Sequence, residues 1–329
     1  MRPTILLVDA FSSERESWKA FLQNQKYCVY TAEDAESAER VCLQLQPDLV
    51  LLFDDFPFVR GYEFCRRLKQ DPRNQLIPVV FISSSPIPGN AAQGLEPGAV
   101  DYWSAPDSLW EALSRMQSLL RLKSYIDEQA KSVLLSLAQS IEAKYPLRSG
   151  HSKSFVEWTV RLGESCGLSE EDLQELRIAC VLHDIGKVAV PDSILLKPGP
   201  LDERETAIVR QHPVIGEKIC APLKSLRRVL PVIRHHHERM DGSGYPDGLR
   251  GDEIPLQARI LQTADVYDAL VTDRPYRRAL STQEAMETLR REARQGWLDD
   301  SLVCKFSRIC RSGECFPILG RSMLASYYA

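Results

Sequence analysis

No apolar run in this sequence approaches the roughly eighteen residues that a helix needs to cross a bilayer. The N-terminus lacks the apolar core and small-residue cleavage site of a secretory signal peptide, so a cytoplasmic location is expected. The nine cysteines include no C-x-x-C pair, which argues against a zinc ribbon or a thioredoxin-type site. A net charge of −4 offers no extended positive surface for a nucleic-acid polymer or an anionic membrane.

Histidine is absent from the first 150 residues, and all six histidines fall between positions 151 and 237. Because imidazole is the commonest metal ligand, this concentration predicts a metal site in the second half of the chain. His183 is followed directly by Asp184, in an apolar stretch that is typical of a buried helix. Burial removes the hydration of both side chains and costs several kcal/mol, which a shared metal ion would offset. A hydrogen-bonded His–Asp pair in the core is the alternative.

Six motifs resemble, in order and spacing, those of the HD-GYP family, over roughly residues 130 to 320. They contain His151; His183-Asp184 with Lys187; His212-Pro213; His236-His237-Glu238 continuing to Tyr245-Pro246; Asp265 with Asp268; and Asp273-Arg274-Pro275-Tyr276-Arg277. The resemblance implies an all-α HD-domain helical bundle. It also implies a metal-dependent phosphodiesterase that hydrolyses cyclic di-GMP to pGpG, with further cleavage to GMP left open.

The resemblance implies two divalent metal ions bridged by Asp184. One ion would be held by His151, His183 and Asp265, and the other by His212, His236 and His237. Seven nitrogen and oxygen ligands without a thiolate favour iron, with manganese as the alternative and zinc less suited. Two such ions can activate a hydroxide for attack on phosphorus.

Residues for the substrate are implied close to the metal ligands. Lys187 lies one helical turn after Asp184, so it can reach the same pocket and neutralise a phosphate oxygen, and both are assigned catalytic roles. The resemblance implies that Arg274 and Arg277 hold the substrate's phosphates. Without the resemblance, the two arginines would be read as charged residues on the surface. Tyr245 lies in a loop with two glycines that is expected to frame the pocket.

Two further expectations concern the surroundings of the site. Glu238 and Asp268 are expected to orient histidine ligands or water. Leu147 stands where family members commonly have a Tyr or a Glu, so a third metal ion is not expected and a pocket hydroxyl is missing. The alternative function is therefore a regulator that binds cyclic dinucleotide or partner signalling proteins with little turnover. A phosphohydrolase acting on another nucleotide is a third hypothesis.

Residues 1–121 alternate four apolar strand segments with three helical segments, which is typical of a doubly wound, flavodoxin-like α/β sheet. They resemble a response-regulator receiver domain that has lost its phosphorylation chemistry. Phe53 occupies the phosphoacceptor position, the acidic pair is reduced to Asp9, and Ala105 replaces the lysine. Successive side chains on a strand face opposite sides, so Asp54 would point away from the pocket that Asp9 lines. We interpret this domain as a pseudo-receiver that serves dimerisation or docking.

Residues 122–145 are expected to connect this domain to the HD-GYP domain of residues 146–329. Apolar spacing from Leu119 to Ile141 predicts an amphipathic helix, either as a coiled-coil spacer of a homodimer or packed on the chain's own core. Gln129 at a heptad position favours the second reading. Six helices are predicted beyond Pro146: 152–166, 169–182, 202–220, 226–235, 255–272 and 282–294. The implied partners are a cyclic dinucleotide, other signalling domains and a second copy of the chain.

Overall fold

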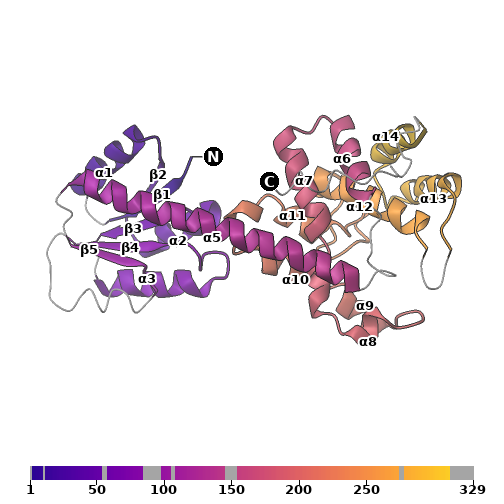
Figure 1. Ribbon diagram of the computed structural model, residues 1–329, viewed down its shortest axis with the longest axis horizontal. Coiled ribbons are helices and arrows are strands. Elements are labelled where there is room, and N and C mark those ends of the chain that lie inside the picture. The colour runs from indigo at the N-terminus through magenta and orange to yellow at the C-terminus, as the bar shows by residue number, and fades with distance from the viewer. Residues whose placement is uncertain are drawn as a thin grey trace. The chain divides into compact units, whose positions relative to one another are not determined.

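The computed structural model describes residues 2–9, 12–53, 58–83, 98–104, 108–144, 154–273 and 278–311 (Figure 1). The chain divides into two compact units, which are taken in turn here. The first contains residues 1–131 with 221–225, and the second contains residues 132–220 with 226–329. Within the described ranges, no helix is both long enough and apolar enough to span a membrane.

The first unit is built on a parallel five-stranded sheet in the order β2-β1-β3-β4-β5. The strands are β1 Thr4–Val8, β2 Cys28–Ala32, β3 Leu49–Phe53, β4 Val79–Ser83 and β5 Asp101–Ser104. The helices α1 Ser12–Asn24, α2 Ala35–Leu45 and α3 Phe58–Gln70 follow the first three strands. The predicted receiver-like fold is confirmed, and the structure adds β5, which hydrophobic patterning did not single out.

Both faces of the sheet are covered by helices, which explains the continuous apolar runs of its central strands. Leu6 and Val8 of β1 pack in one core cluster with residues of α2 and α3, such as Phe64. Ile5 and Leu7 face the opposite cluster, which contains residues of α1 and α5. Figure 1 shows the same arrangement, with α1 and α5 on one side of the sheet and α3 on the other.

Phe53 occupies the end of β3 as a core residue. Its side chain is 3% exposed and meets Trp18 of α1 edge to face, with ring centroids 5.6 Å apart. Asp9 follows β1 and is buried, and Arg15 donates a hydrogen bond to its carbonyl oxygen at 3.0 Å. An apolar ring therefore fills the position from which a receiver's phosphoacceptor would project. Asp54 and Ala105 lie outside the described residues.

The connecting segment is part of α5, a 36-residue helix over Leu109–Lys144. It begins ten residues before the predicted start because it is also the last helix packed on the sheet. Leu119 and Ile141 pack in core clusters, but four apolar residues between them are 40–65% exposed: Leu122, Ile126, Val133 and Leu137. The preferred interpretation, that this face packs on the chain's own core, is wrong for the middle of the helix.

The second unit is all-α in its described residues, as predicted. Its α-helices are α6 Phe155–Ser165, α7 Glu170–Leu182, α8 Asp192–Leu195, α9 Glu203–Val209, α10 His212–Cys220, α11 Leu230–His235, α12 Leu256–Val271, α13 Thr282–Arg294 and α14 Asp300–Arg311. Capping boxes at Ser169 and Asp202 start α7 and α9, at the residues where these two helices were predicted to begin. The single helix predicted over 202–220 is wrong: α9 ends at Val209 and α10 begins at His212. In a continuous helix Pro213 would have no N–H to donate to the Val209 carbonyl, and its ring would clash with that carbonyl. Helix α14 had not been predicted.

Candidate metal centre

The His-Asp doublet lies just past the end of α7. His183 is the C-cap residue of that helix, and Asp184 leaves it with φ −97° and ψ 2° before a 3-10 turn over Ile185–Ala189. The helix predicted over 169–182 is confirmed, but the doublet does not continue it. In a continuous helix the two side chains would diverge by about 100°. Leaving the helix brings His183 Nε2 to 3.5 Å from Asp184 Oδ2.

Three of the histidines are oriented in the same way by the backbone. Nδ1 of each bonds the carbonyl oxygen three residues earlier: His183 to Cys180 at 2.9 Å, His212 to Val209 at 2.7 Å, and His236 to Ile233 at 2.7 Å. Because a carbonyl oxygen can only accept, each Nδ1 carries the proton. Each Nε2 is left as a lone pair, which is the tautomer that a metal ligand requires.

Four of the predicted ligands meet in one cluster. Ligand atoms of Asp184, His212, His236 and His237 all lie within 4.8 Å of one another. Burial lowers the pKa of His212 to about 4, and it also holds the pKa values of His236 and His237 well below the ordinary value. The imidazoles are therefore neutral at physiological pH, and their lone pairs are available.

The donor set of this cluster fits a cation. Nε2 of His212 and Nε2 of His236 are 3.3 Å apart, although neither carries a proton that could join them. Two lone pairs at this distance repel unless a positive charge lies between or beside them. Nitrogens bound to one ion through bonds of about 2.0–2.1 Å can be no more than about 4.2 Å apart, so 3.3 Å is compatible with a shared ion.

The two carboxylate oxygens of Asp184 have different neighbours. Oδ1 lies 3.3 Å from Nε2 of His212, whereas Oδ2 lies near His183 and 2.5 Å from Nζ of Lys187. This divergence is what a bridging carboxylate needs. Lys187 lies one turn of 3-10 helix after Asp184, and its predicted position in the same pocket is found. Asp265, on α12, lines a cavity together with His237.

Gly186 allows this arrangement to form. A Cβ built on Gly186 would lie 2.0 Å from the carbonyl oxygen of His212 and 2.7 Å from the backbone nitrogen of Gly216. The 3-10 turn that carries Asp184 and Lys187 can therefore pack directly on the first turns of α10. The sequence reading of the doublet had not assigned Gly186 this role.

The loop over Asp241–Pro246 presents Tyr245 to the cluster. The Tyr245 ring stacks on His237, with centroids 4.8 Å apart and planes 29° apart, and the Arg210 guanidinium lies 5.2 Å from its centroid. Burial raises the pKa of Tyr245, so the phenol stays protonated. Gly242 has a φ of +80°, and a Cβ on Gly244 would lie 2.4 Å from the Arg239 backbone nitrogen. Both positions therefore require glycine.

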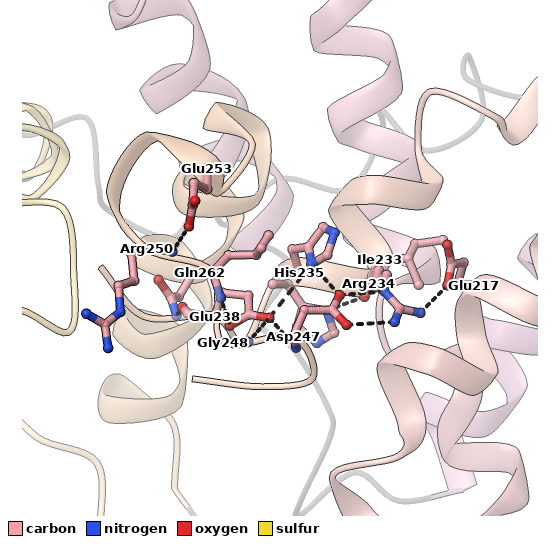
Figure 2. Close-up of polar contacts among 12 residues, drawn as sticks. Glu217, Ile233, Arg234, His235, Glu238, Asp247, Gly248, Arg250, Glu253 and Gln262 are labelled. Atoms are coloured by element: carbon pink, nitrogen blue, oxygen red, sulfur yellow. Dashed lines mark hydrogen bonds and ion pairs between the residues drawn. The ribbon is translucent and has the colours of Figure 1, made fainter. Parts of the chain in front are cut away.

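Glu238 bonds no histidine of the cluster, so its expected role in orienting a histidine ligand is wrong. Its buried carboxylate accepts backbone N–H groups of Asp247, Gly248 and Leu249 at 2.7, 3.1 and 3.1 Å (Figure 2). It thereby closes the loop that carries Tyr245. His235 Nδ1 lies 3.5 Å from Asp247 and 3.8 Å from Glu238, which places it in a separate group from the four clustered ligands. Asp268 is buried in α12.

Several predicted site residues lie outside the described residues: His151, Leu147, Arg274 and Arg277. The structure adds a cavity of about 480 Å³ beside His237 and Asp265, which the motifs did not reveal. Arg239, Glu292 and Trp297 line it; Arg239 lies within the motif of residues 236–246, whereas no sequence signal pointed to Glu292 or Trp297.

Two family models match this chain, one in each of its two units. The HD domain family model matches residues 136–302, and the response regulator receiver domain model matches residues 5–114. The cyclic di-GMP phosphodiesterase response regulator RpfG of Xanthomonas campestris pv. campestris (strain 8004) is 34% identical over 316 residues, covering 87% of this chain and 82% of that protein. A probable cyclic di-GMP phosphodiesterase of Vibrio cholerae is 33% identical, covering 86% and 72%. The 3'3'-cGAMP-specific phosphodiesterase 3 of Vibrio cholerae is 39% identical, covering 49% and 35%.

Proposed function

Because this chain belongs to the HD-GYP family of HD-domain proteins, with a response-regulator receiver domain ahead of the HD domain, we propose that it hydrolyses cyclic di-GMP. The proposed product is pGpG, and further cleavage to GMP stays open until products are measured. The observation that carries this proposal is the convergence of Asp184 with three neutral histidines, each buried or half-buried. Relatives named as phosphodiesterases of cyclic di-GMP span most of this chain, which supports the substrate.

Two divalent cations would be held by the seven predicted ligands. His212, His236 and His237 would hold one, and His151, His183 and Asp265 the other, with Asp184 shared between them. Oxygen and nitrogen donors without thiolate support iron, with manganese as the alternative. When bound, such a pair supplies a nucleophilic water at neutral pH and stabilises charge on the phosphoryl oxygens.

The chain's own residues prepare the site for this ligand set. Carbonyl groups fix the tautomers of three imidazoles, and the ring of Tyr245 fixes the plane of His237. Lys187 lies against Asp184, and its ammonium group would neutralise a phosphate oxygen of the substrate. Arg274 and Arg277 are proposed to hold the phosphates, since guanidinium groups match phosphate geometry.

Turnover tests the proposal directly. Protein purified anaerobically with iron, and separately with manganese, is incubated with cyclic di-GMP while pGpG and GMP are measured. Asp184→Asn is the control, because it keeps the side-chain volume and removes the shared charge. We expect product from the wild type and at least a hundredfold less from the control. Metal-loaded wild type without product would contradict the proposal.

A second candidate is a regulator that binds cyclic dinucleotide or a signalling partner with little turnover. Phe53 favours it, because a buried phenyl ring at the phosphoacceptor position removes the usual input of a receiver. A homodimer is proposed through α5, where Leu122, Ile126 and Val133 expose apolar surface. Binding of cyclic di-GMP by metal-loaded protein that yields no product would favour the regulator.

A further inference from the structure

We infer that Arg239, Glu292 and Trp297 form a guanine-binding subsite beside the metal centre and select guanine over adenine in the cyclic dinucleotide. The inference rests on the proposed function, because it concerns the base of the same substrate. The metal centre cannot provide this specificity for the base, since it would contact only phosphate oxygens. Relatives of this chain carry names with two different cyclic dinucleotides, so the base is an open question at this site.

The cavity has the size and the walls that a nucleoside requires. Its volume of about 480 Å³ lies within the roughly 300–1,000 Å³ of small-molecule sites. Two of the predicted metal ligands, His237 and Asp265, are among its lining residues, so a nucleotide with its phosphate at the metal centre can extend its base into the cavity. Val266, Leu270 and Leu298 supply apolar surface against which a planar ring can pack.

Arg239 is held in a defined orientation. Its guanidinium lies 4.0 Å from the centroid of the Trp297 ring, and its NH1 group is 3.4 Å from the Ser243 hydroxyl. The backbone beside it is tied to the end of α13, since Met240 N donates to Trp297 O at 3.3 Å and Asp241 N to Gly296 O at 2.8 Å. A stacked guanidinium keeps its donor fork in one plane, and this fork matches O6 and N7 of guanine.

Glu292 supplies the complementary acceptor. Its carboxylate is half-buried and lines the cavity. That carboxylate forms no hydrogen bond or ion pair with any residue that the structure describes. Burial raises its pKa, and the positive charges of Arg239 and Arg291 oppose that rise. A desolvated carboxylate without a partner is costly, and a ligand with two donors would relieve the cost.

The end of α13 fixes these groups relative to each other. Trp297 N donates to Glu292 O at 3.0 Å, Gly296 N donates to Ala293 O at 2.9 Å, and Gly296 has a φ of +78°. This is the Schellman pattern, which ends a helix at a defined residue. Glu292 and Trp297 are therefore positioned by one rigid turn, and Arg239 is attached to that turn through the backbone.

Guanine and adenine present opposite groups to this pair. Guanine has acceptors at O6 and N7 for a guanidinium, and donors at N1–H and N2–H₂ on the adjacent edge for a carboxylate. Adenine presents a donor at N6 and an acceptor at N1, which would oppose Arg239 and Glu292 respectively. One bidentate pair of this kind discriminates by roughly 5- to 150-fold.

The test compares guanine and adenine ligands in two ways. Binding of pGpG and pApA to metal-loaded protein is measured by calorimetry, and kcat/KM is measured for cyclic di-GMP and cyclic di-AMP. The variant is Glu292→Gln, whose amide can also pair with adenine. The matched control is Glu287→Gln, an exposed position on the same helix. Thermal unfolding establishes that both variants are folded.

We expect the wild type and the control to prefer pGpG, and Glu292→Gln to reduce that preference by roughly 5- to 150-fold. Equal binding of pGpG and pApA by the wild type would overturn the inference. So would an unchanged preference in Glu292→Gln. A wild type that prefers pGpG but hydrolyses neither cyclic dinucleotide would contradict the proposed function and leave the subsite supported.

Discussion

Replacing Gly186 by alanine tests whether the close packing of the 3-10 turn on α10 assembles the metal centre. The added Cβ would lie 2.0 Å from the His212 carbonyl oxygen, whereas real Cβ contacts are essentially never shorter than 3.0 Å. The neighbouring atoms are backbone, so no side-chain rotation can relieve the overlap. The turn and α10 must therefore separate by about 1 Å. Asp184 is carried by the turn and His212 by α10, so their 3.3 Å contact is displaced.

Two magnitudes follow from this displacement. Overpacking of a core costs about 1–3 kcal/mol, so the free energy of unfolding in guanidinium chloride should fall by that amount. A misplacement of about 1 Å at a catalytic group costs on the order of a hundredfold in rate, so kcat/KM should fall accordingly. Affinity for Mn²⁺, followed by calorimetric titration, should also decrease, because Asp184 no longer meets the histidines.

Gly199→Ala is the matched control. Nothing lies within 4 Å of a Cβ built on Gly199, so this variant should stay within about 0.5 kcal/mol of the wild type and keep its metal affinity. If Gly186→Ala matched Gly199→Ala in stability, Mn²⁺ affinity and turnover, the reasoning about close packing would be refuted.

Three other predictions concern stability and assembly. Glu238→Gln removes one of the carboxylate acceptors that close the 247–249 turn, so the unfolding free energy should fall by about 1.5–3 kcal/mol. The exposed Glu253→Gln is the control and should change the unfolding free energy little. Equal losses for the two variants in urea titrations would contradict this role of Glu238. Burial lowers the pKa of His212 from 6.5 to about 4, so between pH 6.5 and 4 the unfolded chain binds more protons than the folded chain. His212 alone should account for about 3 kcal/mol of the stability that metal-free protein loses as pH falls from 6.5 to 4, and His212→Asn should lose that much less. A difference between the two proteins that does not depend on pH would refute the cause. Val133→Glu places a charge on the exposed apolar face of α5 and should convert a dimer to monomer in sedimentation velocity, and an unchanged mass would exclude that face as the interface.

The sequence alone determined the elements whose signals are local. Continuous apolar runs predicted the strands β1, β3 and β4, because these strands are buried on both faces of the sheet. Ser169 and Asp202 marked helix starts, because a capping box satisfies backbone groups within four residues. The confinement of histidine to positions 151–237, with the family motifs, predicted the four residues that meet in the cluster.

Only the tertiary structure decided what depends on contacts between distant segments. The tautomers of the histidines, the two directions of the Asp184 oxygens and the need for glycine at position 186 arise where α7, α10 and α11 meet. Glu238 closes a loop and does not orient a histidine ligand, because the path of the chain places the backbone N–H groups of residues 247–249 against its carboxylate. Arg239 and Trp297 are 58 positions apart in the sequence, and two backbone hydrogen bonds bring them together. Local patterning cannot encode such pairs, because the free energy that selects them comes from packing and desolvation of the assembled fold.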